Sequence, residues 1–239
     1  MSKMYSASHY QHIDRVEREH FWFVGRNDVI VSLIRRCISD PNGKTFLDVG
    51  CGTGVLLTRL SSMGFSPTGL DINARALSYA KQHTKGQLVR SSIFQYHPNV
   101  HFDSIGAFDV MEHIQDDSGF LARCNTLLKS HGYMFLSVPA DPYLWSAVDV
   151  SSGHLRRYTK DGLRNLFAES GFRIHYMGYW NSLLLPMYIL WRRLAKDTIQ
   201  TYLTQPNSII NRLLLWILHV EGLGRFPFGA TLVVAAQKL

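Results

Sequence analysis

Short apolar runs alternate with segments of helical periodicity along most of the chain. Residues 45–50 (TFLDVG) form an apolar run that ends in glycine, which is typical of a buried parallel strand. Residues 55–64 carry apolar positions at helical spacing and a glycine stop, which predicts a helix. The same pattern predicts further strands at 66–72, 87–92, 102–110, 133–140, 172–179 and 229–239, and helices at 73–84, 116–129 and 160–170. This alternation predicts an α/β fold with a doubly wound, mostly parallel, Rossmann-like sheet of seven strands.

Three segments depart from the alternation. Residues 10–38 predict a helix ahead of the first strand, so we expect residues 1–40 to form an N-terminal helical lid or cap on a single domain spanning 1–239. The loop 141–159 interrupts the regular pattern, and residues 182–223 are apolar and helix-like. Three interpretations of 182–223 stay open, with the first favoured: a cap over an apolar substrate, a helix pair on an anionic membrane surface, or a dimer interface.

Composition narrows the class of protein. The chain has 239 residues, of which 46% are hydrophobic and 18% charged, so it can bury a core and is not disordered throughout. Three cysteines without a CxxC pair argue against a disulfide framework or a zinc site, and we expect no metal. The N-terminus lacks the apolar region of a signal peptide, which favours a cytoplasmic location, with peripheral contact at the inner membrane face as an alternative.

The net charge of +7 is unevenly distributed. Residues 1–150 carry equal numbers of acidic and basic side chains, so the whole excess lies in residues 151–239. A basic segment can meet nucleic acid, an anionic membrane or an anionic substrate, or can serve solubility alone. Because the excess overlaps the two irregular late segments, it favours an anionic or membrane-borne acceptor over nucleic acid.

The strongest chemical signal is the turn LDVGCGTG at 47–54, which follows a predicted strand and precedes a predicted helix. Glycines permit a tight turn and let a ligand approach the backbone closely. Val55 stands where a dinucleotide-binding turn would have glycine, and the lysine of a P-loop is absent. Asp71 lies at the end of the second strand, where a carboxylate can accept both hydroxyls of a ribose; the alternative is a helix-capping role.

Four motifs in this order resemble class I S-adenosylmethionine-dependent methyltransferases. They are FLDVGCGTG, GLDIN (69–73), FDVMEHIQDD (108–117) and LLKSHGYMFLSVP (127–139). The resemblance covers residues 45–180 and implies strand order 3-2-1-4-5-7-6 with the last strand antiparallel. It also implies S-adenosyl-L-methionine as cofactor, with the glycines around its methionine part, Asp48 near its amino group and Asp71 on its ribose. The implied cofactor set is Asp48, Gly50, Gly52, Gly54, Asp71, Ile72, Ser92, Ile93 and Asp109, where Ser92 replaces an acidic residue common in relatives and Asp109 lines the methyl-donor site.

Methyl transfer to a hydroxyl or ammonium group benefits from a base near the sulfonium. The candidate catalytic residues are Glu112 and His113, which follow the fourth strand, and His154 in the loop SSGHLRRYT. The alternative roles are hydrogen bonding within the loop for Glu112 and His113, and helix capping for the His154 segment.

Substrate contacts are expected from two segments that resemble a bacterial group within the superfamily, which carries motifs like EHFWFVGRND (19–28) and GRFPFGATLVVAAQK (224–238). Aromatic rings before the first strand can cover a sulfonium, or can pack the helix on the sheet edge. The candidate substrate-binding residues are His20, Trp22, Arg156, Arg157 and Tyr158.

The sequence therefore predicts methyl transfer to an oxygen or nitrogen of a small or lipid-like acceptor that is anionic or sugar-containing. The first rival is a cofactor-binding partner subunit without transfer activity. A nucleic-acid methyltransferase is disfavoured, because DVME stands where amino-methylating nucleic-acid enzymes carry an N/D-P-P-Y/F motif. A Rossmann dehydrogenase is disfavoured by Val55. A homodimer stays an open alternative.

Overall fold

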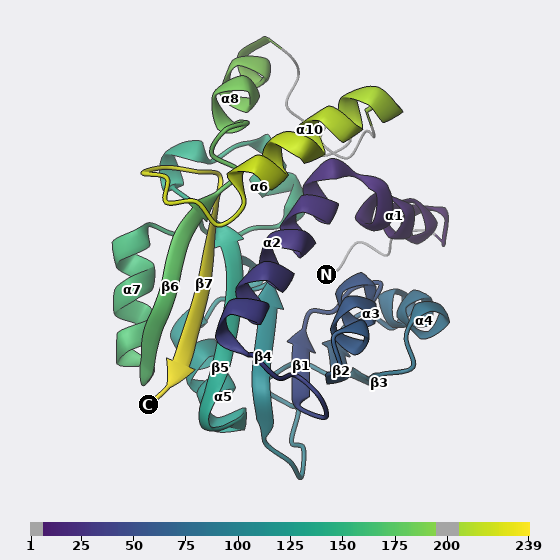
Figure 1. The fold of residues 1–239 in the computed structure, drawn as a ribbon, viewed down its shortest axis with the longest axis vertical. Coiled ribbons are helices and arrows are strands. Elements are labelled where there is room, and N and C mark those ends of the chain that lie inside the picture. Colours follow the sequence, from purple (N-terminus) through teal and green to yellow (C-terminus); the bar gives the residue numbers. More distant parts are fainter. Residues whose placement is uncertain (1–6, 195–205) are drawn as a thin grey trace.

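The computed structural model describes residues 7–194 and 206–239, which form one seven-stranded sheet with helices on both faces (Figure 1). The strand order is β3-β2-β1-β4-β5-β7-β6. The first five strands are parallel, and β7 runs antiparallel to both β5 and β6. This confirms the predicted fold class and order. The strands are β1 Thr45–Val49, β2 Ser66–Asp71, β3 Gln87–Arg90, β4 Phe102–Phe108, β5 Leu128–Pro139, β6 Phe172–Trp180 and β7 Thr231–Lys238.

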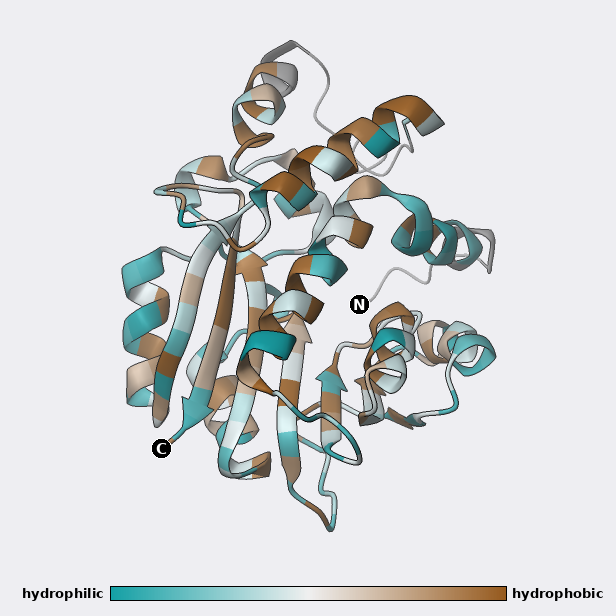
Figure 2. Cartoon of the chain, viewed as in Figure 1, coloured by the Kyte–Doolittle hydropathy of each residue, from teal (hydrophilic) through white to brown (hydrophobic). Residues whose placement is uncertain are grey.

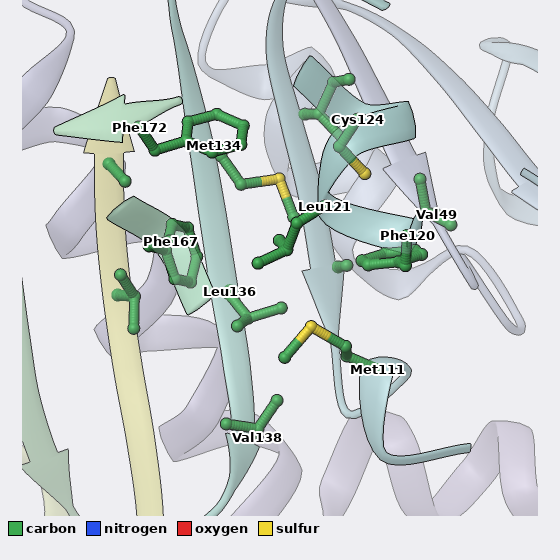
Figure 3. Packing of buried hydrophobic residues seen from close by; sticks show 14 of the residues in the cluster. Val49, Met111, Phe120, Leu121, Cys124, Met134, Leu136, Val138, Phe167 and Phe172 are labelled. Atoms are coloured by element: carbon green, nitrogen blue, oxygen red, sulfur yellow. The ribbon is translucent and has the colours of Figure 1, made fainter. Parts of the chain in front are cut away.

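Two apolar clusters hold the helices against the sheet. On one face α5 (Asp117–Leu127) and α7 (Lys160–Glu169) bury Phe120, Leu121 and Phe167 against β4, β5 and β7 (Figure 3). On the other face α2 (Phe21–Cys37) and α3 (Val55–Ser62) pack against Phe46 and Phe135. The sheet is buried on both sides, which explains why its strands read as continuous apolar runs.

The chain order of the strands reverses at β1, which lies between β2 and β4. The carboxyl ends of these three strands meet at one edge, and open α/β sheets bind ligands at such a point. The loops after β1, β2 and β4 are therefore brought together by topology alone. They carry the glycine turn, Asp71 and Asp109.

The N-terminal segment differs from the single predicted helix over 10–38. It forms α1 (Ala7–Glu19) and α2, separated at His20. The His20 side chain accepts a hydrogen bond from the backbone N–H of Trp22 at 3.3 Å, so His20 caps the second helix. Helical periodicity continues through the break, which is why the sequence pattern did not reveal it.

The boundary between α5 and β5 also differs from the prediction. The helix expected over 116–129 ends at Leu127, and β5 begins at Leu128, five residues earlier than the strand predicted at 133. The register between β4 and β5 shifts between Phe102 and Ser104. The extra residues at the start of β5 form an irregular extension of the strand. The remaining helix of the alternation is α4 (Ala74–His83), capped by Asn73 as its sequence predicts.

The late apolar stretch forms α8 (Leu185–Leu194) and α10 (Ser208–Glu221), while its middle, 195–205, lies outside the described residues. Leu218 of α10 packs on α2 at Gly25, where an added Cβ would come within 2.9 Å of the leucine side chain. Asn211 of α10 donates a hydrogen bond to the backbone carbonyl of Glu19 at 2.8 Å. Within the described ranges, none of the helices has the length and apolar character needed to cross a membrane.

Candidate active site

The glycine turn after β1 adopts backbone angles that favour glycine. Gly50, Gly52 and Gly54 have φ values of 73°, 55° and 80°. A Cβ on Gly50 would lie 2.4 Å from a methyl group of Val110, so this position has no room for a side chain. Glycine at these positions lets the chain adopt the tight turn without strain.

Asp71 ties this turn to the next helix. Its Oδ2 accepts a hydrogen bond from the Gly52 N–H at 3.0 Å, and its Oδ1 accepts one from the Asn73 N–H at 2.7 Å. Burial raises the pKa of Asp71, and these backbone hydrogen bonds oppose that rise. A carboxylate has about four lone-pair sites, so accepting two backbone N–H groups leaves capacity for ligand hydroxyls.

Two more carboxylates surround the turn. Asp48 at the end of β1 is 3% exposed, and burial raises its pKa to about 8, with the Asp71 and Glu17 charges adding to the rise. Glu17 of α1 accepts a hydrogen bond from the Thr53 hydroxyl, and burial raises its pKa as well. Three carboxyl groups with raised pKa values indicate a place in the fold where a positive charge would be favourable.

Arg26 of α2 is the cation that opposes this acidic group. It lowers the pKa of Asp48 by charge attraction and pairs with Asp109, with 2.5 Å between Nη1 and Oδ2. Its guanidinium lies 5.3 Å from the ring centre of Trp22 and 5.4 Å from that of Phe23. Neither Glu17 nor Arg26 was identified from the sequence. The aromatic run HFWF followed by arginine at helical spacing was the available signal for Arg26.

Asp109 follows β4 in a left-handed backbone conformation, with φ of 57°, which is uncommon for a residue other than glycine. Its N–H donates to the Ser137 carbonyl at 3.0 Å, and its Oδ1 accepts from the Ser137 hydroxyl at 3.1 Å. Strained residues held this firmly cluster at functional sites. Asp109 thus connects Arg26 to the end of β4 and to the short turn η1 (Met111–His113).

The three predicted catalytic residues converge. One ligating atom from each of Glu112, His113 and His154 lies within 4.8 Å of the others. The rings of His113 and His154 are 4.9 Å apart and nearly perpendicular, and His154 Nε2 lies 4.0 Å from Glu112 Oε1. Glu112 is fully buried, and neither of its oxygens has a hydrogen-bond partner within the described part of the chain. Burial and then the Asp109 charge raise its pKa well above the ordinary value, while partial shielding from water and the neighbouring His154 lower the pKa of His113.

The loop after β5 holds His154 through a buried ion pair. His154 Nδ1 lies 2.8 Å from Asp149 Oδ1, and Arg157 binds both oxygens of Asp149 at 2.8 and 2.9 Å. Burial alone would raise the pKa of Asp149, but the hydrogen bonds from His154 and Arg157 hold it well below its ordinary value. Ser146 caps the short helix α6 (Ala147–Ser152) and donates from its backbone N–H to the same carboxylate at 2.8 Å.

The other predicted substrate residues make contacts within the chain itself. Arg156 pairs with Asp117 at 2.7 Å, and the buried Tyr158 donates to the carbonyl of Met111 at 3.3 Å. His20 is 2% exposed, and burial lowers its pKa to about 4. Trp22 packs near Trp180, with ring centres 6.0 Å apart. These contacts anchor the loops, and roles in substrate binding stay predictions.

The remaining predicted cofactor residues lie around the ends of β2 and β3. Ile72 follows Asp71 in the chain and is 71% exposed, so its apolar side chain is accessible to a ligand. Ser92 accepts a hydrogen bond from the Gln95 N–H at 3.3 Å, and Ile93 is buried with its carbonyl accepting from Arg123. Contact of these residues with a cofactor stays a prediction.

Comparison with known proteins gives the family. Residues 19–176 match the family described as "Methyltransferase domain". Similar curated proteins include the ubiquinone biosynthesis O-methyltransferases of Glaesserella parasuis serovar 5, 32% identical over 40% of this chain and 45% of that protein, and of Bradyrhizobium sp., 35% identical over 42% and 41%. The chain spans about half the length of the curated relatives it matches.

Solved structures share the fold over nearly the whole chain. The magnesium protoporphyrin IX methyltransferase of Synechocystis PCC 6803 covers 97% of this chain and 94% of its own, with a TM-score of 0.63 and 14% identity. The Haemonchus contortus phosphoethanolamine N-methyltransferase 2 covers 99% of this chain and 58% of its own, with a TM-score of 0.68 and 15% identity. At these identities the likeness concerns the fold.

The strand order with a reversed β7, and the glycine turn facing an acid at the end of β2, define the class I S-adenosylmethionine-dependent methyltransferase fold. The chain belongs to the methyltransferase-domain family.

Proposed function

We propose that this chain transfers the methyl group of S-adenosyl-L-methionine to a hydroxyl oxygen of a small, lipid-like acceptor. The observation that carries the proposal is the convergence of Glu112, His113 and His154 directly after Asp109. A hydroxyl must lose its proton as it attacks a methyl group, so histidines and a carboxylate belong at the acceptor oxygen. The names of the curated relatives, O-methyltransferases of ubiquinone biosynthesis, support an oxygen nucleophile over a nitrogen.

The glycine turn fits this cofactor. S-Adenosylmethionine carries an ammonium and a sulfonium group, and Asp48, Asp71 and Glu17 supply more buried carboxylate than Arg26 alone offsets. Within this arrangement Asp71 would hold the ribose hydroxyls and Asp48 the ammonium group. Arg26, held over two aromatic rings, would meet the cofactor's carboxylate. The cofactor supplies a methyl group already activated by the positive sulfur, and the chain orients it and excludes water.

The residues of the chain divide the remaining work. Asp109 is fixed by Ser137 and Arg26 at the end of β4, which positions the donor side. His154 is oriented by Asp149, so that its Nε2 faces the acceptor side. The exposed His113 stands at the rim, where the acceptor enters. Positioning of this kind supplies much of the catalysis of methyl transfer, which needs no covalent intermediate.

The proposal is tested with metabolite extracts. Extract from a strain lacking the gene is incubated with the purified chain and methyl-labelled S-adenosylmethionine, and products are read by untargeted mass spectrometry. We expect a compound that gains one labelled methyl group on oxygen with the wild-type chain. The variant His154→Ala should lose this product while keeping its cofactor affinity, and the exposed His175→Ala serves as the matched control. Cofactor binding without any labelled product would favour the rival, a binding subunit without transfer activity.

The exposed face of α10 supports a lipid-borne acceptor. Ile209, Leu213, Trp216 and Val220 repeat at helical spacing and are 54% to 79% exposed. Figure 2 shows this helix as a series of brown bands, in contrast to the mostly teal α1. Met187 and Leu190 of α8 are also more than half exposed. A stripe directed to solvent supports contact with a surface more than a cap over a buried pocket.

The charge of the chain is complementary to an anionic bilayer. The excess of +7 belongs to residues 151–239, which include α10 with Arg212. Exposed apolar side chains on a basic part of the chain suit peripheral binding at anionic lipid headgroups. We therefore propose that α10 rests on an anionic membrane that carries the acceptor.

Sedimentation with vesicles tests this contact. We expect the wild-type chain to pellet with vesicles of phosphatidylglycerol and phosphatidylcholine and to remain in solution with phosphatidylcholine alone. Replacing Leu213 and Trp216 by serine should abolish the binding, whereas Val100→Ser, at an exposed loop before β4, should not. A wild-type chain that never pellets, and instead elutes as a dimer that the double variant converts to a monomer, would identify a second copy as the occupant.

A further inference from the structure

The geometry points to a divalent transition-metal site formed by Glu112, His113 and His154, with an open position for the acceptor hydroxyl. The role of the ion in the reaction rests on the proposed function, whereas the site itself rests on the geometry of these three side chains. The cysteine pattern led us to expect no metal. The ligands here are instead two imidazoles and a carboxylate, and more than forty positions in the sequence separate Glu112 from His154.

The distances suit one ion. Metal–nitrogen bonds of about 2.0–2.1 Å and metal–oxygen bonds of about 2.0–2.2 Å place two ligand atoms of the same ion roughly 3–3.5 Å apart. Here the three ligating atoms lie within 4.8 Å of one another, and the Nε2 of His154 is 4.0 Å from Glu112 Oε1. A side-chain movement of less than about 1 Å would close the set around an ion.

Both imidazole rings are oriented by hydrogen-bond partners at their Nδ1 atoms. His154 meets Asp149 through Nδ1 at 2.8 Å, and His113 meets the backbone carbonyl of Gly153 through Nδ1 at 3.2 Å. An acceptor on Nδ1 fixes the proton there and leaves the lone pair of Nε2 available for a metal. Metal-binding histidines characteristically have such carboxylate or carbonyl partners. Arg157 in turn holds Asp149 in place through an ion pair.

Glu112 supplies the independent observation. Its side chain is fully buried, and both carboxylate oxygens lack a hydrogen-bond partner within the described residues. A buried carboxyl group without partners is costly, so native structures pair such groups or use them to coordinate metals. His154 and His113 face the same space, and a cation there would satisfy the carboxylate.

The backbone holds these ligands in place before any ion binds. The Leu155 N–H donates to the carbonyl of Glu112 at 2.8 Å, and the Tyr158 hydroxyl donates to the carbonyl of Met111 at 3.3 Å. The loop after β5 is thereby fastened to the turn after β4. Two segments that supply different ligands are thus kept at a fixed separation, as a preformed metal site requires.

The donor set selects the kind of ion. Two neutral imidazoles and one carboxylate suit Zn²⁺, Fe²⁺ or Co²⁺, whereas Mg²⁺ prefers oxygen ligands. Three protein ligands with a fourth open position are typical of catalytic zinc sites. The exposed His113 leaves that position accessible from solvent.

The ion would act as a Lewis acid on the acceptor. Bound at the open position, the hydroxyl has a lowered pKa, its O–H bond breaks and the proton leaves to solvent. The oxygen electron pair then forms the new O–CH₃ bond, while the electron pair of the sulfur–methyl bond stays on sulfur and yields the neutral thioether. No oxidant or reductant enters this balance.

Metal titration of the full chain, freed of any histidine tag and dialysed against a chelator, tests the site. Co²⁺ added to the wild-type chain should give visible absorption bands that saturate at one equivalent, and Zn²⁺ should bind by calorimetry with the same stoichiometry. Glu112→Gln and His154→Ala should weaken Zn²⁺ binding more than about 100-fold, because the first removes the ligand charge and the second removes a ligand. His175→Ala, which removes an exposed histidine of β6, should bind as the wild type does.

Two further measurements distinguish the possible outcomes. Circular dichroism and S-adenosylmethionine affinity verify that Glu112→Gln is folded. A wild-type chain that gives no Co²⁺ bands, or binds Zn²⁺ no better than Glu112→Gln, overturns the site. In that case methyl transfer that survives chelation would leave His154 as a general base and the proposed function intact. Stoichiometric Zn²⁺ binding that depends on Glu112, without any methylated product, would uphold the site and defeat the proposed function.

Discussion

Two buried aspartates at the same edge of the sheet have pKa values that are shifted in opposite directions. Asp48 lies within β1, next to its last residue, and is 3% exposed, and burial raises its pKa to about 8. Asp149 lies in the short helix α6 after β5, fully buried, and its pKa is held well below the ordinary value. Both side chains are shielded from solvent. The difference lies in their partners. Arg157, His154 and Ser146 all contact the Asp149 carboxylate, whereas within the described part of the chain Arg26 is the cation that acts on Asp48, and Arg26 also acts on Glu17.

This difference separates structure from ligand binding. A carboxylate that the chain neutralises by itself contributes to the fold and positions its neighbours. A buried carboxylate that the chain supplies with little positive charge gains a counter-charge when a cationic ligand binds. Asp149 therefore belongs to the scaffold of the acceptor side, and Asp48 to the binding of the cofactor.

The largest expected effect comes from breaking the ion pair between Arg157 and Asp149. Arg157→Met should lower the free energy of unfolding by about 3–5 kcal/mol, because it leaves the Asp149 carboxylate buried without its bidentate partner. Urea denaturation measures this loss. Arg164→Met, which breaks the exposed pair with Asp161, is the control and should cost less than about 1 kcal/mol. Equal losses in both variants would contradict the distinction between scaffold and surface.

The next largest effect is expected at Asp71, which is proposed to bind the cofactor. Asp71→Ala should weaken S-adenosylmethionine binding more than about 100-fold, equivalent to about 2.7 kcal/mol, since it removes the acceptor proposed for two ribose hydroxyls. Calorimetry gives the affinity, and circular dichroism verifies that the chain is folded. Asp71→Asn keeps one of the two oxygens that hold the turn, so it separates loss of the turn from loss of ligand contact. Unchanged affinity in Asp71→Ala would refute the ribose assignment.

A smaller effect of opposite sign is expected at Asp48. Asp48→Asn should raise the free energy of unfolding of the chain without cofactor at pH 8, because burial disfavours the ionised carboxylate and the amide carries no charge. The same variant should bind the cofactor less tightly. In contrast, Asp149→Asn should destabilise the chain. If both substitutions destabilise the chain equally, the comparison between the two aspartates fails.

The pH dependence of stability follows from the same contrast. The folded pKa of Asp48, about 8, lies above its unfolded value of about 4, so the folded state binds more protons between these values. Stability without cofactor should therefore fall as pH rises from about 5 to 8, and this slope should flatten in Asp48→Asn. The depressed pKa of Asp149 acts in the other direction and takes effect only as pH falls below about 4. Denaturation at several pH values measures both slopes.

The smallest effect is the proton released when the cofactor binds. At pH 7 Asp48 is mostly protonated, and a cationic ligand favours its ionised form, so binding should release up to about one proton. Calorimetry in two buffers of different ionisation enthalpy detects this release. Binding heats that do not depend on the buffer would mean that Asp48 does not face the cofactor's charge. Asp48→Asn should abolish the release.

Local features of this protein could be predicted from its sequence. The glycines at 50, 52 and 54 mark a turn because their backbone angles depend on the residue itself, and Asn73 caps α4 through its immediate neighbours. The alternation of strands and helices determined the fold class, since burial on both faces leaves a direct pattern of apolar runs. The family motifs added the strand order, which periodicity alone did not contain.

Contacts across large sequence separations were decided only by the tertiary structure. Glu17 meets Thr53 from 36 positions away, and Arg26 meets Asp109 from 83 positions away. The sequence suggested Glu112, His113 and His154 as separate candidates, but their convergence depends on the fastening of one loop to another. Likewise, the sequence suggested Arg157 as a substrate contact, and in the structure it is the buried partner of Asp149.

The sequence by itself determined where the chain turns, which segments are buried and which ligand class the glycine turn suits, because these depend on neighbours within a few residues. Whether a given carboxylate is neutralised by the chain or left for a ligand was decided by the tertiary structure. That outcome depends on the distance to a cation from another element, and electrostatic energy in a buried site changes steeply with that distance.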